Sequence, residues 1–442
     1  MRSLSGAFGW LVRKEWRDLM ASRSWWVMLV LMGPLVGVSF ISAVRTYGEL
    51  SGAGGTGAGV GEAFAPLIGI WAPTFSACEL AAAFLLPFVA IRLVSGDRQS
   101  GALKLELQHP MPALARMAAK ALVLLAAWLL ASIPPLVAIV FWRLYGGTTY
   151  WPELTAVFAG HLLNAGLSVA LACAAASLTE HPSTAAILTL SVTVGTWILS
   201  FVAAVHGGLW DRLAGYTPTA MVARFQHGLV SLDAVLIAGA LTAAGLALGA
   251  IWMRLGAALS RRVAQSLALA AATAAFVAAA AQVTASWDLS EARANSFPRP
   301  DEAVLARVGG PLEILVHLAP EDPRRVDLEL RGLSKLRRVR PDVRVSYEAE
   351  TTTGLFEQAN SHYGEVWYRL HDKRVVTRAV TPESVLQSIY EAAGVTAPAI
   401  AEEDVFRGHP LAAQPKGAAV TFYGLWPAAI TAAALWLRRR DG

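Results

Sequence analysis

The apolar residues of this chain lie in long uncharged runs that are separated by short polar segments. A run of about 20 such residues is long enough for a helix to cross the hydrocarbon core of a bilayer. The pattern predicts eight membrane-spanning helices, at residues 25–44, 71–94, 121–142, 154–178, 183–205, 234–253, 263–287 and 418–437. We therefore expect an α-helical polytopic membrane protein.

Two of these runs carry pairs of glycines spaced by about one helical turn. Gly33 and Gly37 lie in the first run, and Gly245 and Gly249 lie in the sixth. Small residues at this spacing allow another helix to approach closely. Each pair therefore predicts a face on which a second helix packs.

The pattern changes between the last two runs. Residues 288–416 are rich in charge and contain no uncharged run of membrane length. Alternation predicts strands at 312–318 and 343–347 and a hairpin around His371. Thr381 as cap and Pro382 at the first position predict a helix that ends before Gly394. We expect an α/β extracytoplasmic domain inserted between the last two helices.

A further helix is expected inside this domain, at residues 325–340. Its apolar residues recur at helical spacing, which predicts that one face packs inward. The expected inward residues are Val326, Leu330, Leu333 and Leu336.

These patterns divide the chain into consecutive parts. The expected domains are a cytoplasmic interfacial helix at 1–24, a six-span unit at 25–258, a seventh span at 263–287, the α/β domain at 288–416, an eighth span at 418–437 and a cytoplasmic tail at 438–442.

Composition agrees with a membrane protein. The chain is 55% hydrophobic and 16% charged, with a mean hydropathy of +0.47, whereas about 25% of the residues of a soluble domain are charged. The formal net charge of +5 does not indicate nucleic-acid binding, because the basic residues gather at the ends of the spans, where lipid headgroups lie. The two cysteines give neither a disulfide framework nor a metal-binding pattern.

The distribution of Lys and Arg also predicts orientation. Short loops that are rich in these residues stay on the cytoplasmic side. The N-terminal segment, residues 92–120, residues 254–262 and the C-terminal arginines carry most of them outside the polar domain. We expect a multi-pass protein of the bacterial inner membrane, with both termini in the cytoplasm and residues 288–416 outside.

The first 24 residues form one amphipathic pattern. An apolar face is formed by Phe8, Leu11, Val12, Trp16 and Leu19. Glu15 falls on that apolar side and makes the stripe imperfect. The pattern predicts a helix on the inner membrane surface; the alternative is an ordinary positively charged flank of the first span.

The loop at residues 92–120 carries the most informative motif. It reads Asp97-Arg98, then Ser100-Gly101-Ala102-Leu103, with Leu107, Pro110 and Lys120 before the next span. This order resembles ABC-2 type transporter permeases. It departs from the common form in two places: Gly96 precedes Asp97 where an acidic pair is usual, and Ala102 stands where Thr is usual.

The resemblance implies a division of labour. A separate cytoplasmic ABC ATPase subunit would bind ATP and Mg²⁺, and this chain would need no cofactor of its own. The loop would receive the ATPase, and a second permease copy or homologue would complete the path. The implied coupling residues are Asp97, Arg98, Gly101, Leu103, Glu106, Leu107 and Pro110.

The remainder of the chain resembles the auxiliary domain of gliding-motility-type ABC systems. The resemblance lies in Trp287-Asp288-Leu289-Ser290 directly after a span, the strand that follows, and a terminal span ended by an arginine cluster. It implies a permease fused to an auxiliary domain and assigns no chemistry to individual residues.

Three polar residues inside the spans are candidates for a transport path: Glu79, His161 and Asn164. Ionisable groups at membrane depth often serve function. The alternatives are that Glu79 reaches water at the outer interface and that His161 and Asn164 are hydrogen-bonding contacts between helices.

Several catalytic motifs are absent from the sequence. It contains no G-x-x-x-x-G-K-[ST], H-E-x-x-H or G-x-S-x-G pattern, so we expect no catalytic residue and no metal ligand in this chain. The expected function is that of a non-catalytic permease subunit. The alternative is a membrane scaffold or sensor that couples the outer domain to a cytoplasmic partner, and a membrane-embedded enzyme is a weaker third reading.

Overall fold

The computed structural model describes residues 2–52, 64–102, 106, 111–206, 208–254, 256–319, 322–348, 361–399 and 406–441. The chain forms two compact units. Unit 1 comprises Met1–Trp197, Tyr216–Ala285 and Gly408–Gly442, and unit 2 comprises Ile198–Gly215 and Ser286–Arg407.

Among the described residues, eight helical stretches are long and apolar enough to cross a membrane. They are Arg23–Gly52, Leu67–Gln99, Ala113–Leu144, Trp151–Leu178, Pro182–Ala203, Leu232–Trp252, Leu259–Ala280 and Val420–Arg439. The chain is therefore a polytopic helical membrane protein, as the hydropathy pattern predicts.

Several boundaries differ from those expected. The first spanning helix continues to Gly52, so Arg45 belongs to it and not to a loop. The third is divided at Ser132, because Pro134 and Pro135 cannot extend the preceding helix and instead open a new one. The seventh begins at Leu259 and ends at Ala280, seven residues earlier than expected, since polar residues follow from Gln282.

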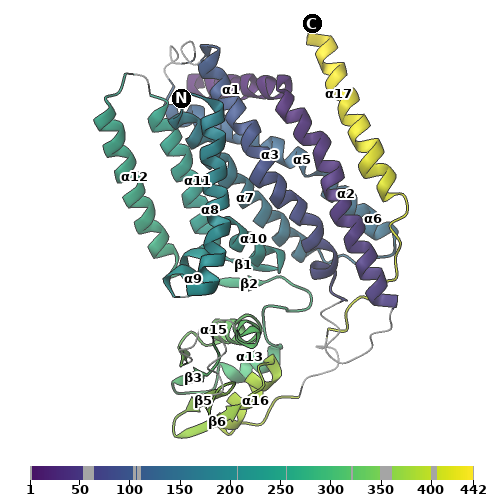
Figure 1. Ribbon diagram of the computed structural model, residues 1–442, viewed down its shortest axis with the longest axis vertical. Coiled ribbons are helices and arrows are strands. Elements are labelled where there is room, and N and C mark those ends of the chain that lie inside the picture. The colour runs from purple at the N-terminus through teal and green to yellow at the C-terminus, as the bar shows by residue number, and fades with distance from the viewer. Residues whose placement is uncertain are drawn as a thin grey trace. The chain divides into compact units, whose positions relative to one another are not determined.

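The helices and short elements outside Ser286–Arg407 follow in chain order, and α9 among them belongs to unit 2 (Figure 1). They are α1 (Arg2–Ala21), α2 (Arg23–Gly52), η2 (Leu67–Trp71), α3 (Ala72–Gln99), α5 (Ala113–Ala131), α6 (Ile133–Leu144), α7 (Trp151–Leu178), α8 (Pro182–His206), α9 (Leu209–Ala214), α10 (Pro218–Gln226), β1 (Leu229–Ser231), α11 (Leu232–Trp252), α12 (Leu259–Ala280), η6 (Val420–Leu425) and α17 (Trp426–Asp441). Helix α1 lies across the end of the long helices.

The first glycine pair forms the contact between α2 and the last span. A Cβ atom on Gly33 would lie 2.2 Å from Trp426 Cδ1, and one on Gly37 would lie 2.5 Å from Phe422 Cβ. Trp426 Nε1 also donates a hydrogen bond to the Leu29 carbonyl (2.7 Å). The predicted packing face is confirmed.

The second glycine pair lies at the contact of α11 with α7 and α5. A Cβ on Gly245 would lie 3.0 Å from Ala170 Cβ, and one on Gly249 would lie 2.7 Å from Met117 Cε. The prediction of close packing is confirmed here too. These helices share one large apolar core, in which helices approach at nearly backbone distance.

Unit 2 contains a four-stranded sheet in the order β4-β3-β5-β6. Strand β3 (Leu312–Val316) pairs in parallel with β4 (Arg344–Tyr347) and antiparallel with β5 (Val366–Leu370), and β5 pairs antiparallel with β6 (Lys373–Thr377). The other elements are β2 (Ser286–Asp288), α13 (Arg299–Leu305), α14 (Pro323–Asp327), η3 (Leu328–Leu333), α15 (Ser334–Val339) and α16 (Pro382–Ala393).

The core of this unit comes from alternate strand residues and the helices beside them. Ile314 of β3 and Tyr368 of β5 are fully buried. They belong to one cluster with Leu333, Val385 and Ile389 of the helices. One face of the sheet is therefore covered.

Local chemistry agrees with the sequence at two places. Thr381 caps α16 by accepting a hydrogen bond from the Ser384 amide, and Gly394 ends the helix in the left-handed conformation (φ 65°). His371 turns the β5–β6 hairpin with φ 53°.

The helix expected at 325–340 has a different inward face. Val326 and Leu330 are 50% and 68% exposed, so their predicted inward positions are wrong. Leu333 and Leu336 are fully buried, as predicted. The π-helical segment η3 adds a residue to its turn, so Leu328 is buried in place of Val326 and Leu330.

Unit 2 also ends earlier than residue 416. The His409 amide donates to the Phe64 carbonyl (2.8 Å), and the Leu411 amide donates to Ser51 Oγ (2.9 Å). The stretch before the last span therefore packs beside α2, within unit 1.

Candidate functional site

Six charged side chains come together where α1, α3 and α5 meet, and we call them the charged cluster. Its members are Lys14, Glu15, Asp97, Glu106, Arg116 and Lys120. All except Lys14 are at most 6% exposed.

Helix α1 contributes Glu15 to the cluster, because this carboxylate lies on the otherwise apolar face of the helix. Leu11, Glu15 and Leu19 share one helical face, and all three are buried. Helix α1 packs against α5. Glu15 therefore faces α5, and a carboxylate in that position needs a cationic partner.

Lys120 is that partner. Its Nζ lies 2.7 Å from Glu15 Oε1 and also contacts Asp97 Oδ2 at hydrogen-bond distance. Only about 1% of its side chain is exposed. One buried ammonium group thus connects helices α1, α3 and α5.

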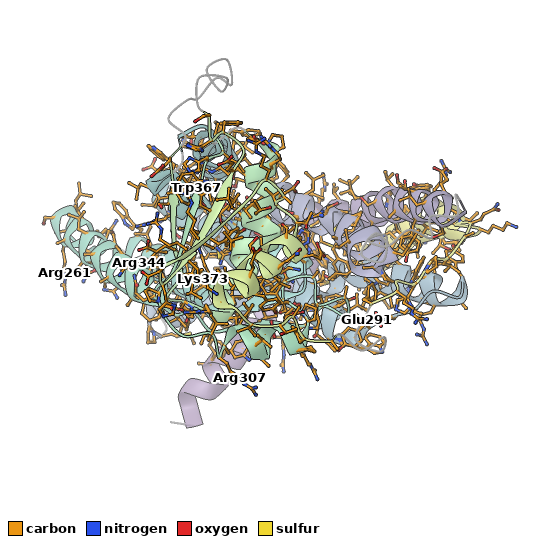
Figure 2. The ribbon with its side chains drawn as sticks, turned by 90° about the horizontal axis from the view of Figure 1, so that it is seen from below. Arg261, Glu291, Arg307, Arg344, Trp367 and Lys373 are labelled. Carbon is orange, nitrogen blue, oxygen red and sulfur yellow. The ribbon has the colours of Figure 1, made fainter. Side chains whose placement is uncertain are left out.

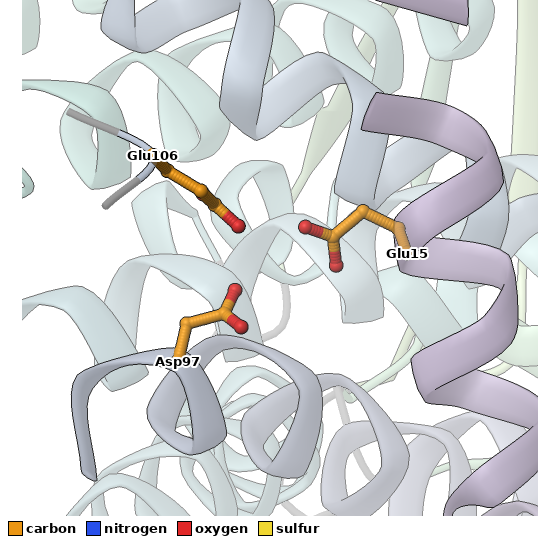
Figure 3. A group of neighbouring side chains, drawn as sticks. All are labelled: Glu15, Asp97 and Glu106. Atoms are coloured by element: carbon orange, nitrogen blue, oxygen red, sulfur yellow. The ribbon is translucent and has the colours of Figure 1, made fainter. Parts of the chain in front are cut away.

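Lys14 is a second cation that contacts the three carboxylates of the cluster. Its Nζ lies 2.7 Å from Asp97 Oδ1 and 3.1 Å from Glu15 Oε1. It also lies 2.6 Å from Glu106 Oε1, in an ion pair that lacks hydrogen-bond geometry. Figure 3 shows the carboxyl groups of Glu15, Asp97 and Glu106 turned toward one another.

The two members of the charged cluster on α1, Lys14 and Glu15, have shifted pKa values. Burial raises the pKa of Glu15, and Asp97 adds to this effect against the opposing influence of Lys120. Burial alone would lower the pKa of Lys14, but Glu15, Asp97 and Glu106 outweigh it and raise the pKa. Lys14 is therefore a stable cation at physiological pH.

Three carboxylate oxygens of Glu15, Asp97 and Glu106 lie within 4.8 Å of one another, a spacing that would suit a metal ion. The ammonium groups of Lys14 and Lys120 already lie among them. We therefore assign no metal to this group.

Arg98 points the opposite way and binds the C-terminal ends of two other helices. Its guanidinium donates to the carbonyls of Ser177 (2.8 Å) and Thr179 (2.9 Å) at the end of α7, and to that of Trp252 (3.3 Å) at the end of α11. The last carbonyls of a helix lack partners within the helix, and a cation satisfies them. The Asp97-Arg98 pair thus connects α3 with four other helices.

A cavity of about 360 Å³ adjoins the charged cluster. Its walls are Ala7, Trp10 and Leu11 of α1 together with Met111, and Glu106 and Arg116 complete it. Trp10 is 55% exposed. The cluster therefore borders an apolar hollow at the surface of unit 1.

The structure brings together part of the predicted coupling loop. Asp97 and Glu106 join the cluster, Arg98 binds helix ends, and Gly101 adopts a positive φ of 77°, as a tight turn requires. Leu103, Leu107 and Pro110 lie outside the described residues.

The three candidate path residues lie elsewhere in unit 1. His161 and Asn164 are buried on α7. His161 Nε2 lies 3.3 Å from the Gln226 side-chain amide, and its ring stacks on Phe75 (5.5 Å). Glu79 is partly buried on α3, one turn beyond Phe75. The contact of His161 with Gln226 joins α7 to α10, and its stacking on Phe75 joins α7 to α3. His161 thus makes contacts between helices, as the alternative to a path residue predicts.

The sequence did not predict the buried ion pairs of Lys120 or the contact of Arg116: both were counted among the charges that set orientation, and Lys120 also as a position of the permease motif. The signal was Glu15. A carboxylate on an apolar helical face implies a buried cation elsewhere, and Lys120 stands directly before a long uncharged run.

No protein-family model matches the chain, and no curated protein matches it. The functional conclusion therefore rests on the residues and their geometry.

Proposed function

We propose that this chain is the transmembrane permease subunit of an ABC-type transporter in a bacterial inner membrane. A separate cytoplasmic ATPase would supply the energy. The observation that carries the proposal is the pair Asp97-Arg98, which connects the last turn of α3 to α1 and α5 on one side and to α7 and α11 on the other.

A buried network of this kind transmits displacement. The ion pairs around Lys120 hold α1, α3 and α5 in one arrangement, and Arg98 adds the ends of α7 and α11. A partner that moves the segment at residues 100–112 therefore moves several membrane helices together. A linked set of helices of this kind would let the movement of a nucleotide-binding partner change the membrane helices together.

The proposal includes an orientation and partners. The charged cluster lies on the cytoplasmic side, where the ATPase binds α1 and residues 92–120. Two permease copies line the path for an unidentified substrate. Residues 288–407 form an extracytoplasmic α/β domain that receives the substrate or an envelope partner.

Co-purification from native membranes, followed by ATP hydrolysis in proteoliposomes, tests the proposal. We expect an ATPase chain with a Walker A loop to accompany the permease. Replacing Arg98 with Ala should reduce coupled hydrolysis about tenfold or more while the complex still assembles, because removing the guanidinium leaves helix ends unbound.

The matched control is Arg143→Ala, an exposed arginine in the last turn of α6, which should leave coupling unchanged because it lies outside the segments to which the ATPase is proposed to bind. Purification without any ATPase chain, or hydrolysis that is indifferent to Arg98, would contradict the proposal. Either result would favour a scaffold or sensor.

A further inference from the structure

Among the described residues of unit 2, the helices cover one face of the sheet and leave its second face uncovered. Along β3 and β5, residues alternate between buried and accessible positions. Ile314 and Tyr368 face the helices, whereas Glu313 and Arg369, next to them in sequence, are exposed. Because strand side chains alternate, the exposed positions share the opposite face.

The strand register arranges this face in three rows that cross the sheet, and we call it the open sheet face. The first row is Arg344, Glu313, Arg369 and Arg374. The middle row is Ser346, Leu315, Trp367 and Val376. The third row, one step beyond the paired strands, is Glu348, His317, Glu365 and Arg378.

The middle row is apolar except for Ser346 and lies between two charged rows. Trp367, labelled in Figure 2, is its largest side chain. The Arg374 guanidinium lies 3.3 Å from its ring centroid, and the His317 ring lies 4.4 Å from it. Val376 is 45% exposed. Tryptophan and arginine inside a polar rim are the usual anatomy of a protein interface.

The charges of this face select its partner. A polyanion would meet the carboxylates of Glu313, Glu348 and Glu365, and a polycation would meet four arginines. Either uniform partner would therefore bring like charges together, which costs several kcal/mol. The partner that fits is one with the same alternating rows.

We propose that the open sheet face binds the same face of a second copy of this chain. Two faces in contact are related by a two-fold axis that lies between them. With the axis across the strands, Arg344 meets Glu348 of the second copy, and Arg369 meets its Glu365. With the axis along the strands, Glu313 meets Arg369 and Glu348 meets Arg378. Each arrangement also opposes one kind of arginine pair, which the two-fold axis repeats: Arg374 with Arg378 in the first and Arg344 with Arg374 in the second.

The size of the face indicates a weak contact. Four strands about 4.8 Å apart and about five residues long present on the order of 300 Å², well below the roughly 800 Å² per partner of a stable interface. The contact therefore depends on both copies being held in one membrane, which raises their effective concentration. The inference rests on the proposed function only for the presence of two copies of the chain in the same membrane.

Cysteine cross-linking of the full chain in membranes tests the contact. Cys78 and Cys173 are buried and would be replaced by Ala. If the axis crosses the strands, Ser346→Cys and Val376→Cys should each cross-link to themselves. If it follows the strands, only a mixture of the two variants should cross-link.

The control is Val326→Cys, which is also half exposed but lies on α14. No cross-linking of the singles or of the mixture above the level of this control overturns the proposal.

Charge reversal gives a second measurement. Arg369→Glu should lower the cross-linking yield roughly tenfold, because it opposes two carboxylates. Adding Glu365→Arg should restore the yield if the axis crosses the strands, and Glu313→Arg should do so if it follows them. An unchanged yield in Arg369→Glu also overturns the contact.

These results separate the contact from the proposed function. Cross-linking without a co-purified ATPase supports the contact and contradicts the transporter. ATP-driven coupling without cross-linking supports the transporter and contradicts the contact.

Discussion

The charged cluster of unit 1 and the open sheet face of unit 2 use the same residue types in opposite settings. In the cluster, Lys120 is almost fully buried against Glu15 and Asp97. On the sheet, Arg369 and Glu313 are 3.6 Å apart and about half exposed. Water screens the second pair and not the first. The comparison teaches that an ion pair fixes structure only where no solvent can replace a lost partner.

The largest expected effect comes from Lys120→Met. It leaves the Glu15 and Asp97 carboxylates buried without this cation, so the free energy of unfolding should fall by about 3–5 kcal/mol. The matched change Arg369→Met on the sheet should cost less than about 1 kcal/mol. Chemical denaturation of the purified protein measures both.

A compensating variant sharpens this test. Adding Glu15→Gln and Asp97→Asn to Lys120→Met removes the stranded charges and should recover most of the lost stability. Equal effects of Lys120→Met and Arg369→Met would break the comparison between the two regions.

A smaller effect tests whether packing, rather than charge, holds α17 to unit 1. Gly33→Val places a side chain on the Trp426 ring, and such overpacking typically costs about 1–3 kcal/mol. Gly239→Ala is the control, since nothing lies within 4 Å of its added Cβ. Chemical denaturation should show a loss of stability in the first variant only; no loss in either variant would show that the glycine contact does not stabilise the packing of α17.

The smallest effect is a pH dependence of unit 2. Burial lowers the pKa of His317, reinforced by Arg374 and His362 against Glu348 and Glu365. Below the ordinary value of 6.5 the unfolded state therefore binds more protons than the folded state. Stability is complete above pH 6.5 and should fall as pH drops below it, by at most about 1.4 kcal/mol per unit.

Hydrogen exchange of residues 312–318 at pH 7.5 and pH 5.5, corrected for the intrinsic rate, measures this loss. His317→Gln should reduce the difference. His371→Asn, an exposed position whose left-handed backbone asparagine tolerates, should keep it. If His317→Gln shows the same pH response as the unsubstituted protein, the His317 imidazole is not the cause of that response.

Much of the fold could be predicted from the sequence because its determinants are local. Uncharged runs give the spans, and Gly33 and Gly245 mark packing faces through their spacing alone. Thr381 and Gly394 set the ends of α16 by their own backbone and side-chain chemistry.

The rest depends on contacts that no local pattern contains. The pairing of Lys120 with Glu15 joins residues 105 positions apart, so the sequence placed Lys120 in the permease motif and among the orienting charges but did not predict its partner. The π turn at Leu328–Leu333 is likewise set by tertiary packing, and it moved Leu330 from the expected core to the surface. The Asp97-Arg98 motif was visible, but its partners on α7 and α11 were not.

The packing of Trp426 against Gly33 also has a consequence for biosynthesis. The hydrogen bond from Trp426 to Leu29 spans 397 positions of the chain. At about 5–20 residues per second, a ribosome needs roughly 20–80 s to make that length. During this interval α17 does not yet exist to pack on the Gly33 face of α2. The nascent protein therefore exposes that face to lipid or to an insertion factor until its final span emerges.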